Sequence, residues 1–359
     1  MLSPWIVHLN GPEYGVGDVT GATSSFSNIN PGVHNQDYFY DTGPSLEFLR
    51  SRGWTHVKLP IRWERIQASI YGPLRGSEVE LLAAFLDRAA TVGLSVIVDV
   101  HNYGIFYEDV AGEGVRRAIG STMLPLSAFS DLWSKLAREF GGHPAVVGYA
   151  IMAEPQEAGG LTSAIWQQAS QAAVEAIRTY DVASEIHVAG FGWSSAAHWT
   201  HYNRRHWILD PVGGDLIRYE GHHYFDSDWS GEYFMSYSDE VAAASAERPA
   251  GRYGDPLWNR VFAEARDFIG WLQAHRVKGI VGEMGWPGSV NPWQWAELGE
   301  VYVRYMHGLG IPCVPWFAGA WAGSEDDLRI YEGTEPMSTP RPQAVVMERV
   351  IRELSDRRR

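Results

Sequence analysis

Glu154 and Glu283 are the two residues of this sequence whose surroundings most strongly suggest chemistry. Glu154 ends the apolar stretch 146–153, and Glu283 directly follows the short run 280–282. Two carboxylates facing each other across a groove are what hydrolysis of a glycosidic bond requires. One donates a proton to the leaving oxygen, while the other attacks the anomeric carbon or activates water. A single carboxylate at a strand end is more often solvated or ion-paired, so the residues around this pair decide its meaning.

Further polar and aromatic side chains follow other apolar runs in the same way. They are Lys58, His101, Asn102, His222, Tyr224 and Trp316. Each has an ordinary explanation on its own, but their occurrence at the ends of successive strands favours a shared site. A cation such as Lys58 would keep one carboxylate ionised, whereas burial would raise the pKa of the other.

The elements that must position these residues are short strands that alternate with helices along the chain. Near-continuous apolar runs, typical of strands covered on both faces, predict strands at 5–9, 55–59, 95–101, 146–152, 185–190, 218–223, 278–282 and 311–317. Helical spacing of apolar residues predicts helices at 43–52, 77–92, 127–140, 162–180, 257–275, 293–307 and 342–355. Ser77 and Glu80 form a capping-box pattern at the start of the second helix.

Eight strands alternating with helices predict an α/β fold, a (β/α)8 TIM barrel. No linker or low-complexity tract divides the sequence, so we expect one catalytic domain over residues 1–359. An open, doubly wound sheet is the alternative, but no glycine-rich phosphate loop follows the early strands. In a barrel the candidate residues would meet at the carboxyl ends of the strands, where active sites of this fold lie.

The composition limits the possible partners. The formal net charge of −14 argues against binding nucleic acid or an anionic membrane surface, both of which need basic patches. No apolar run reaches the ~18 residues of a membrane span. The single cysteine, Cys313, excludes a disulfide within the chain, and we expect a monomer. The N-terminus has no signal-peptide pattern, which leaves a cytoplasmic protein and a secreted protein without its leader both open.

Tryptophan is abundant, with 16 residues, and its flat apolar face can stack on a sugar ring. Trp193 and Trp229 follow predicted strand ends, so we expect them to line a sugar-binding groove. We expect no metal and no cofactor. His222 and His223 would point to opposite faces of a strand, and the stretch 226–237 lacks the final glutamate of a calcium loop.

Six segments, in order along nearly the whole chain, carry a resemblance to a known family. They are GWTHVKLPIRWERIQ (53–67), VDVHNYG (98–104), YAIMAEPQE (149–157), YEGHHYFDSDWSG (219–231), IVGEMGW (280–286) and WFAGAWAG (316–323). Together they resemble glycoside hydrolase family 5, and within it the fungal-type endo-β-1,4-glucanases, or cellulases. Each motif alone is weak, whereas six in order at barrel spacing are specific.

The resemblance implies a retaining mechanism without metal or cofactor, acting on an oligo- or polysaccharide. Glu283 would be the nucleophile and Glu154 the acid/base. His101, His222 and Tyr224 would orient the carboxylates and the sugar, and Trp316 would be the sugar platform at the point of cleavage.

Two positions depart from the family pattern. Its asparagine before the acid/base, which binds the sugar 2-hydroxyl, is Ala153 here, and its second-strand arginine is Lys58. We expect an endo-acting β-glucanase. Two alternatives stay open. One is a β-glycosidase for a sugar held differently at its 2-position, such as a mannan, an exo-type oligosaccharide or a glycoconjugate. The other is a weakly active sugar-binding barrel.

Overall fold

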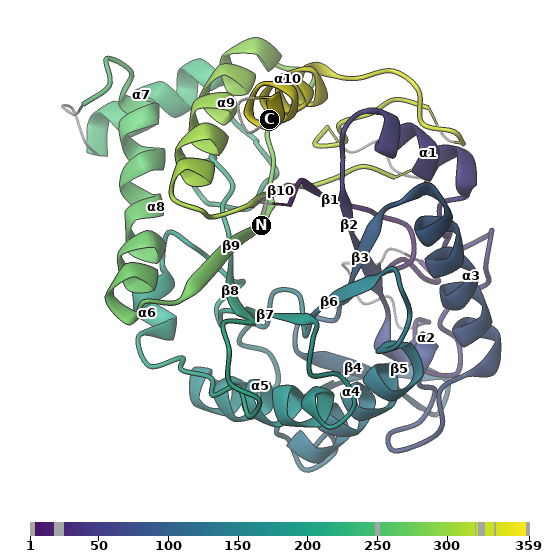
Figure 1. The fold of residues 1–359 in the computed structure, drawn as a ribbon. Coiled ribbons are helices and arrows are strands. Elements are labelled where there is room, and N and C mark those ends of the chain that lie inside the picture. The colour runs from purple at the N-terminus through teal and green to yellow at the C-terminus, as the bar shows by residue number, and fades with distance from the viewer. Residues whose placement is uncertain are drawn as a thin grey trace.

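The strands close into a ring with helices on its outside (Figure 1). The computed structural model describes residues 4–17, 25–247, 252–319, 321, 327–333 and 335–356. Within these ranges the large sheet has eight parallel strands: β1 (Ile6–His8), β2 (His56–Ile61), β3 (Ser95–Val100), β6 (Val146–Ala150), β7 (Glu185–Ala189), β8 (Ile217–His222), β9 (Lys278–Met284) and β10 (Cys313–Pro315). Closure comes from Ala318, whose backbone N–H donates to the carbonyl of His8 at 2.8 Å. The predicted (β/α)8 barrel is therefore confirmed, and the open sheet is not formed.

The seven predicted helices are present with bounds within two residues of those expected. They are α1 (Gly43–Ser51), α3 (Gly76–Val92), α4 (Leu126–Phe140), α5 (Ser163–Arg178), α8 (Pro256–His275), α9 (Pro292–Gly308) and α10 (Pro342–Asp356). Their apolar stripes pack on the ring; in α5, Trp166, Ala169, Ala173 and Ile177 are all buried. The described helices include none with the length and apolar character that a membrane crossing requires.

One helix start differs from the prediction. Helix α3 begins at Gly76, and Arg75 is its N-cap, with no side-chain hydrogen bond to the first turn. The capping box predicted at Ser77 and Glu80 is wrong because Ser77 already lies inside the helix.

Five short elements were not predicted from the sequence. They are the helices α2 (Trp63–Ile66), α6 (Trp199–Asn203) and α7 (Tyr237–Glu247), and the hairpin of β4 (Ile105–Val110) with β5 (Glu113–Ala118). The hairpin turns through Ala111 and Gly112, both at positive φ, as a two-residue hairpin loop of the favoured twist requires. It follows β3 and is held to the barrel by Glu64, which accepts from the Tyr107 N–H at 2.7 Å.

Inside the barrel, one layer of side chains is apolar and the next is polar. Inward residues two apart share a face of their strand. The apolar layer consists of Ile6, Ile97, Ala150, Ile280 and Val314. The polar layer, nearer the carboxyl ends of the strands, consists of His8, Lys58, Asp99, His187 and Glu220, all at most 1% exposed. Gly282 leaves the space that Glu220 fills, since a Cβ there would lie 2.3 Å from the Glu220 carboxyl carbon.

Candidate active site

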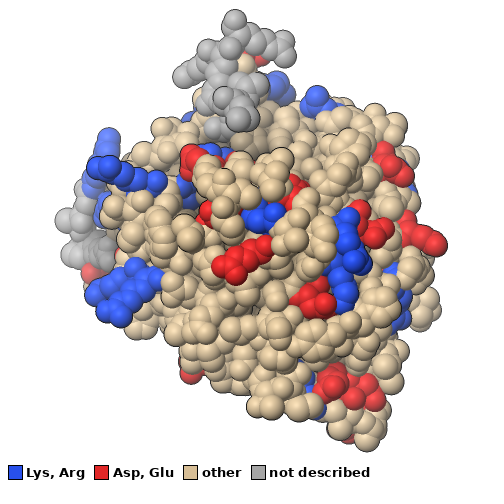
Figure 2. Space-filling model, turned by 60° about the horizontal axis from the view of Figure 1, so that its bottom comes forward, with Lys and Arg blue, Asp and Glu red and all other residues tan. Residues whose placement is uncertain are grey.

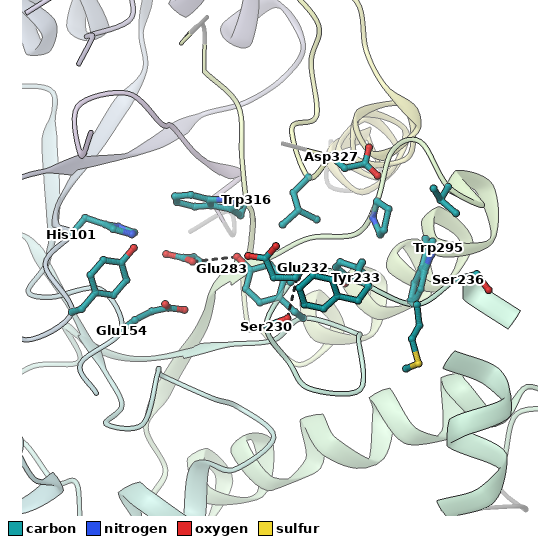
Figure 3. Close-up of a pocket in the computed structure, with 18 of the residues that line it drawn as sticks. His101, Glu154, Ser230, Glu232, Tyr233, Ser236, Glu283, Trp295, Trp316 and Asp327 are labelled. Carbon is teal, nitrogen blue, oxygen red and sulfur yellow. Dashed lines mark hydrogen bonds between the residues drawn. The ribbon is translucent and has the colours of Figure 1, made fainter. Parts of the chain in front are cut away.

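Glu154 and Glu283 meet at the carboxyl ends of the strands. Glu154 lies just beyond β6, and Glu283 lies near the end of β9. Figure 3 shows the two side chains reaching toward each other across the mouth of the barrel. A carboxylate oxygen from each, together with a ring nitrogen of His222, lies within 4.8 Å of the others. This spacing favours the close pair of a retaining glycosidase over the ~6.5–9.5 Å of an inverting one.

His222 joins the pair to the polar layer below. Its Nδ1 lies 2.8 Å from Glu154 Oε1 and 3.5 Å from Glu283 Oε2, and its Nε2 lies 3.0 Å from Glu220 Oε1. Burial alone would lower the pKa of His222, but these carboxylates outweigh it and raise the pKa to about 10. The imidazole is therefore protonated at neutral pH and donates from both nitrogens.

Glu283 sits in a buried but strongly polar position. Tyr224 donates its hydroxyl to Glu283 Oε2 at 3.3 Å. Burial raises the pKa of Glu283 above the ordinary value; the positive charges of His222, His101 and Lys58 oppose the rise, and Glu154 adds to it. The cations thus favour the ionised carboxylate that a nucleophile must be.

The backbone at Glu154 adopts an unusual conformation. Its φ is 47°, in the left-handed region that side chains other than glycine rarely occupy. Ala153 before it is fully buried, and its backbone is fixed on both sides: its N–H donates to Val100 O at 2.9 Å, and its carbonyl accepts from the Tyr103 N–H at 3.1 Å. The end of β3 and the loop that follows it therefore hold Glu154 in a strained turn that aims its carboxylate into the mouth.

His101 and Trp316 form another side of the mouth. Their rings stack at 5.5 Å between centroids, with 26° between the planes. His101 Nδ1 lies 3.0 Å from Asp99 Oδ2. Burial works to lower the pKa of His101, but the hydrogen bond and charge of Asp99 prevail and raise it. Asp99 thereby fixes the ring from below and leaves its other edge for the mouth.

Two cavities adjoin at the catalytic pair and share Glu154, Tyr224, Ser230 and Glu232; Glu283 lines one of them. The Trp193 cavity, of about 630 Å³, is lined among others by Trp193, Tyr202, His222 and Trp229. The Trp316 cavity, of about 600 Å³, is lined among others by Tyr14, His101, Glu283 and Trp316 (Figure 3). Such volumes are usual for ligand sites. Trp193 keeps 52% of its surface exposed, as an aromatic platform for a sugar would.

Comparison with known proteins agrees with this geometry. Residues 18–321 match the model of the cellulase family, glycosyl hydrolase family 5. The chain belongs to glycoside hydrolase family 5. As a member of this family it is a glycoside hydrolase, which confirms the resemblance drawn from the six sequence motifs.

Two curated relatives and one solved structure illustrate the similarity. Endo-β-1,4-glucanase A of Emericella nidulans is 25% identical over 297 residues, covering 82% of this chain and 79% of that protein. Endo-β-1,4-glucanase B of the same organism is 27% identical over 308 residues, covering 84% and 82%. The structure of endoglucanase Cel5A of Pseudomonas stutzeri superposes with a TM-score of 0.77 at 33% identity, covering 98% of this chain and 94% of that one.

Most of the predicted site residues of this glycoside hydrolase come together at the mouth. Those that line a cavity are Glu154, Glu283, His101, His222, Tyr224, Trp193, Trp229 and Trp316. Three that we expected to contact substrate line neither cavity and are fully buried: Lys58, Asn102 and Ala153. For these three the expectation of substrate contact is corrected to a supporting position.

The physical reasons for that correction differ. Asn102 is occupied by the protein itself, accepting from the Trp63 N–H at 2.8 Å and donating to Glu64 at 2.7 Å. Lys58 lies in the polar layer, with its Nζ 2.7 Å from Glu220 Oε1 and 3.9 Å from Asp99 Oδ2. It acts on Glu283 through its charge alone.

Three further residues near the catalytic pair were not predicted from the sequence: His8, Asp99 and Glu220. His8 Nε2 lies 3.4 Å from Asp99 Oδ2 and 3.7 Å from Glu283 Oε1. Burial lowers the pKa of His8 to about 4, so its imidazole is neutral. The sequence does contain a signal for these residues, because each is a polar residue within a strand that is otherwise largely apolar.

Tyr103 was noted within its motif but not as a site residue. It lines the Trp316 cavity, and its ring packs edge-on to His101 at 5.3 Å. Burial, reinforced by the charges of Glu154 and Glu283, raises the pKa of its phenol well above the ordinary value. The phenol therefore stays protonated and can donate a hydrogen bond beside the catalytic pair.

Two trios of side chains in the described residues bring metal-ligand atoms together: His8, Asp99 and His101, and Glu154, His222 and Glu283. Neither suits a divalent cation. The Lys58 ammonium lies 3.9 Å from Asp99 Oδ2 in the first, and His222 in the second is protonated at neutral pH. In the first trio a metal ion would meet the lysine charge, and in the second it would have to displace the proton of His222.

We expect Lys58→Met to affect both stability and the pH dependence of activity. It removes the lysine charge beside the buried Glu220 and Asp99, so the free energy of unfolding should fall by about 3–5 kcal/mol. Without the Lys58 charge the pKa of Glu283 rises further, and the acid limb of the kcat/KM profile should move to higher pH. Denaturant unfolding and a pH profile on an aryl glycoside measure the two effects.

Lys135→Met is the matched control, because Lys135 pairs with Asp131 in a partly exposed position on α4. Its expected cost is about 0–1 kcal/mol, with no change in the pH profile. An unshifted acid limb in Lys58→Met would show that Lys58 does not influence the carboxylate that titrates.

Proposed function

We propose that this glycoside hydrolase is an endo-acting β-1,4-glucanase that works by retention, with Glu283 as nucleophile and Glu154 as acid/base. The observation that carries the proposal is a close carboxylate pair at which two cavities meet. A polysaccharide chain can extend beyond the point of cleavage in both directions, as endo action requires. The printed activities of the relatives, endo-β-1,4-glucanases, support the same substrate.

The contacts of each residue indicate its part in the reaction. Glu154 protonates the leaving oxygen while Glu283 attacks the anomeric carbon, and a glycosyl-enzyme forms. Glu154 then removes a proton from the water that resolves this intermediate. The protonated His222, which touches both carboxylates, offsets their mutual repulsion throughout. Trp193 and Trp229 lie on the Glu154 side, where the leaving part of the chain would stack.

The surface charge supports a neutral partner. On the face seen in Figure 2, Lys and Arg side chains lie in small separate groups among uncharged surface and acidic groups. They form no continuous basic strip of the kind that nucleic acid needs. We propose that residues 1–359 act as one catalytic domain and as a monomer.

A second candidate substrate follows from Ala153. Its buried methyl group cannot bind a sugar 2-hydroxyl, so a backbone sugar with a different 2-position, as in a mannan, is the alternative. Tyr103 lines the Trp316 cavity, and its protonated phenol offers a replacement donor to the 2-hydroxyl of a glucan. This favours the glucan as the first substrate to test.

The test is product analysis on soluble β-1,4-glucan, mannan and xylan. We expect a rapid loss of viscosity on the glucan, mixed oligosaccharide products, and the β-anomer as the first product in proton NMR. Products from mannan alone would identify the second candidate. Early α-anomer would contradict retention, and binding to all three without turnover would indicate a sugar-binding barrel.

A further inference from the structure

The Trp316 cavity extends further than one backbone sugar at the point of cleavage requires. Besides the catalytic mouth it has a side arm, which leaves the barrel axis between the segments that follow β8 and β9. The side arm is lined by residues 233–236, Pro287, Val290 and Trp295. In Figure 3 Tyr233, Ser236 and Trp295 lie at the opposite end of the cavity from His101 and Glu154.

The side arm has firm walls. Tyr233 donates its hydroxyl to Gly285 O at 2.5 Å and accepts from the Phe225 N–H at 2.9 Å, which ties one wall to the floor. Gly285 packs closely against its neighbours, since a Cβ there would lie 3.0 Å from Trp316 O and 3.5 Å from the Tyr224 ring. Trp295 is fully buried and packs edge-on against Tyr233 at 4.9 Å. The arm is thus part of the packed structure rather than a gap between loops.

The lining has the chemistry of a site for a neutral sugar. Phe234 and Val290 are 82% and 53% exposed and offer apolar surface for a sugar face. Glu232 lies where the arm joins the mouth, and within the described residues its carboxylate has no cationic partner. Such a carboxylate accepts hydrogen bonds from sugar hydroxyls and repels an anionic group.

The shape of the mouth determines which part of the substrate reaches the arm. A glucose ring has one edge with the 2- and 3-hydroxyls and another with the ring oxygen and carbon 6. His101 and Tyr103, which can hydrogen-bond the secondary hydroxyls, line the side of the mouth away from the arm. Among the residues that the structure describes, the cavity continues on the other side past Leu328 into the arm. The edge with carbon 6 therefore fits the open side.

We infer that the side arm binds a neutral single-sugar branch on O6 of the glucose unit at the point of cleavage. The preferred substrate is then a β-1,4-glucan with 6-linked branches. This inference rests on the proposed glucanase function and names its substrate more narrowly.

The test compares cello-oligosaccharides with the same chains bearing α-1,6-linked xylose. We expect the wild-type enzyme to cleave so that a branched glucose becomes the new reducing end, as mass spectrometry of the products would show. Val290→Trp fills the arm and should lower the ratio of kcat/KM on branched over unbranched chains by at least about tenfold. Ser236→Trp, from the other wall, should do the same.

Val182→Trp is the matched control, since Val182 is 60% exposed and lies before β7, at the other end of the barrel; it should leave the ratio unchanged. A misfolded fraction lowers both rates equally, so the ratio does not respond to it. The inference would be overturned if the enzyme cleaved the unbranched chain but not at a branched glucose. An unchanged ratio in both arm variants would also overturn it. Either result would leave the proposed glucanase function intact. Failure to cleave either chain would overturn the proposed function and the inference with it.

Discussion

Glu283→Gln is expected to lower kcat on β-1,4-glucan by about four to six orders of magnitude, the size of loss seen when a nucleophile is removed. The amide has the same shape and keeps the contact with Tyr224, so the fold and sugar binding should remain. It cannot attack the anomeric carbon, and no glycosyl-enzyme can form. Steady-state rates on the glucan and thermal melting of the variant measure the two properties.

Two further experiments test whether Glu283 is the nucleophile. Glu297→Gln changes an exposed glutamate of α9 in the same way and should keep full activity. In Glu283→Ala, azide can enter from the face that the carboxylate has left, so an activated aryl β-glycoside should yield the α-glycosyl azide. Ordinary turnover by Glu283→Gln, or a β-glycosyl azide from Glu283→Ala, would place the nucleophile elsewhere.

Glu154→Ala should discriminate between leaving groups. Hydrolysis of a cello-oligosaccharide needs a proton on the leaving oxygen, so its rate should fall about 10²–10⁴-fold. An aryl glycoside with a highly acidic phenol needs little help, and formation of its glycosyl-enzyme should be nearly unaffected. Stopped-flow measurement of the released phenol separates this step from the slower hydrolysis that follows.

Azide again provides the decisive product. In Glu154→Ala it should attack the glycosyl-enzyme and give the β-glycosyl azide, the opposite anomer from that of the nucleophile variant. Glu157→Ala, an exposed glutamate on the same segment, is the control and should behave as wild type. Equal losses on both kinds of substrate would argue against Glu154 as the acid/base.

The sequence predicted the barrel because buried parallel strands leave a clear apolar signal. The stretch 146–152, for example, appears as β6 (Val146–Ala150). It also predicted the cavity-lining part of the site, since Glu154 and His222 stand where strands end. The hairpin after β3 was not predicted because its turn uses Ala111 and Gly112 rather than an asparagine–glycine pair.

The polar layer was missed for a different reason. Strand alternation tells which residues share a face, but in a barrel both faces are buried and the pattern does not say which face is inside. Lys58 was expected at the mouth because its strand was predicted to end at residue 59, whereas β2 continues to Ile61 and leaves Lys58 beside His8, one layer below. Asn102 was misplaced because its role in joining two loops depends on contacts distant in sequence.

The left-handed backbone of Glu154 also has a consequence for protein engineering. Glycine would adopt this φ without steric cost, and it would remove one of two facing carboxylates. Selection for heat resistance alone would therefore tend to replace the very residue that protonates the leaving group. A stabilisation campaign on this enzyme should hold position 154 fixed, or screen every thermostable variant for turnover, since stability and activity are opposed at this point of the chain.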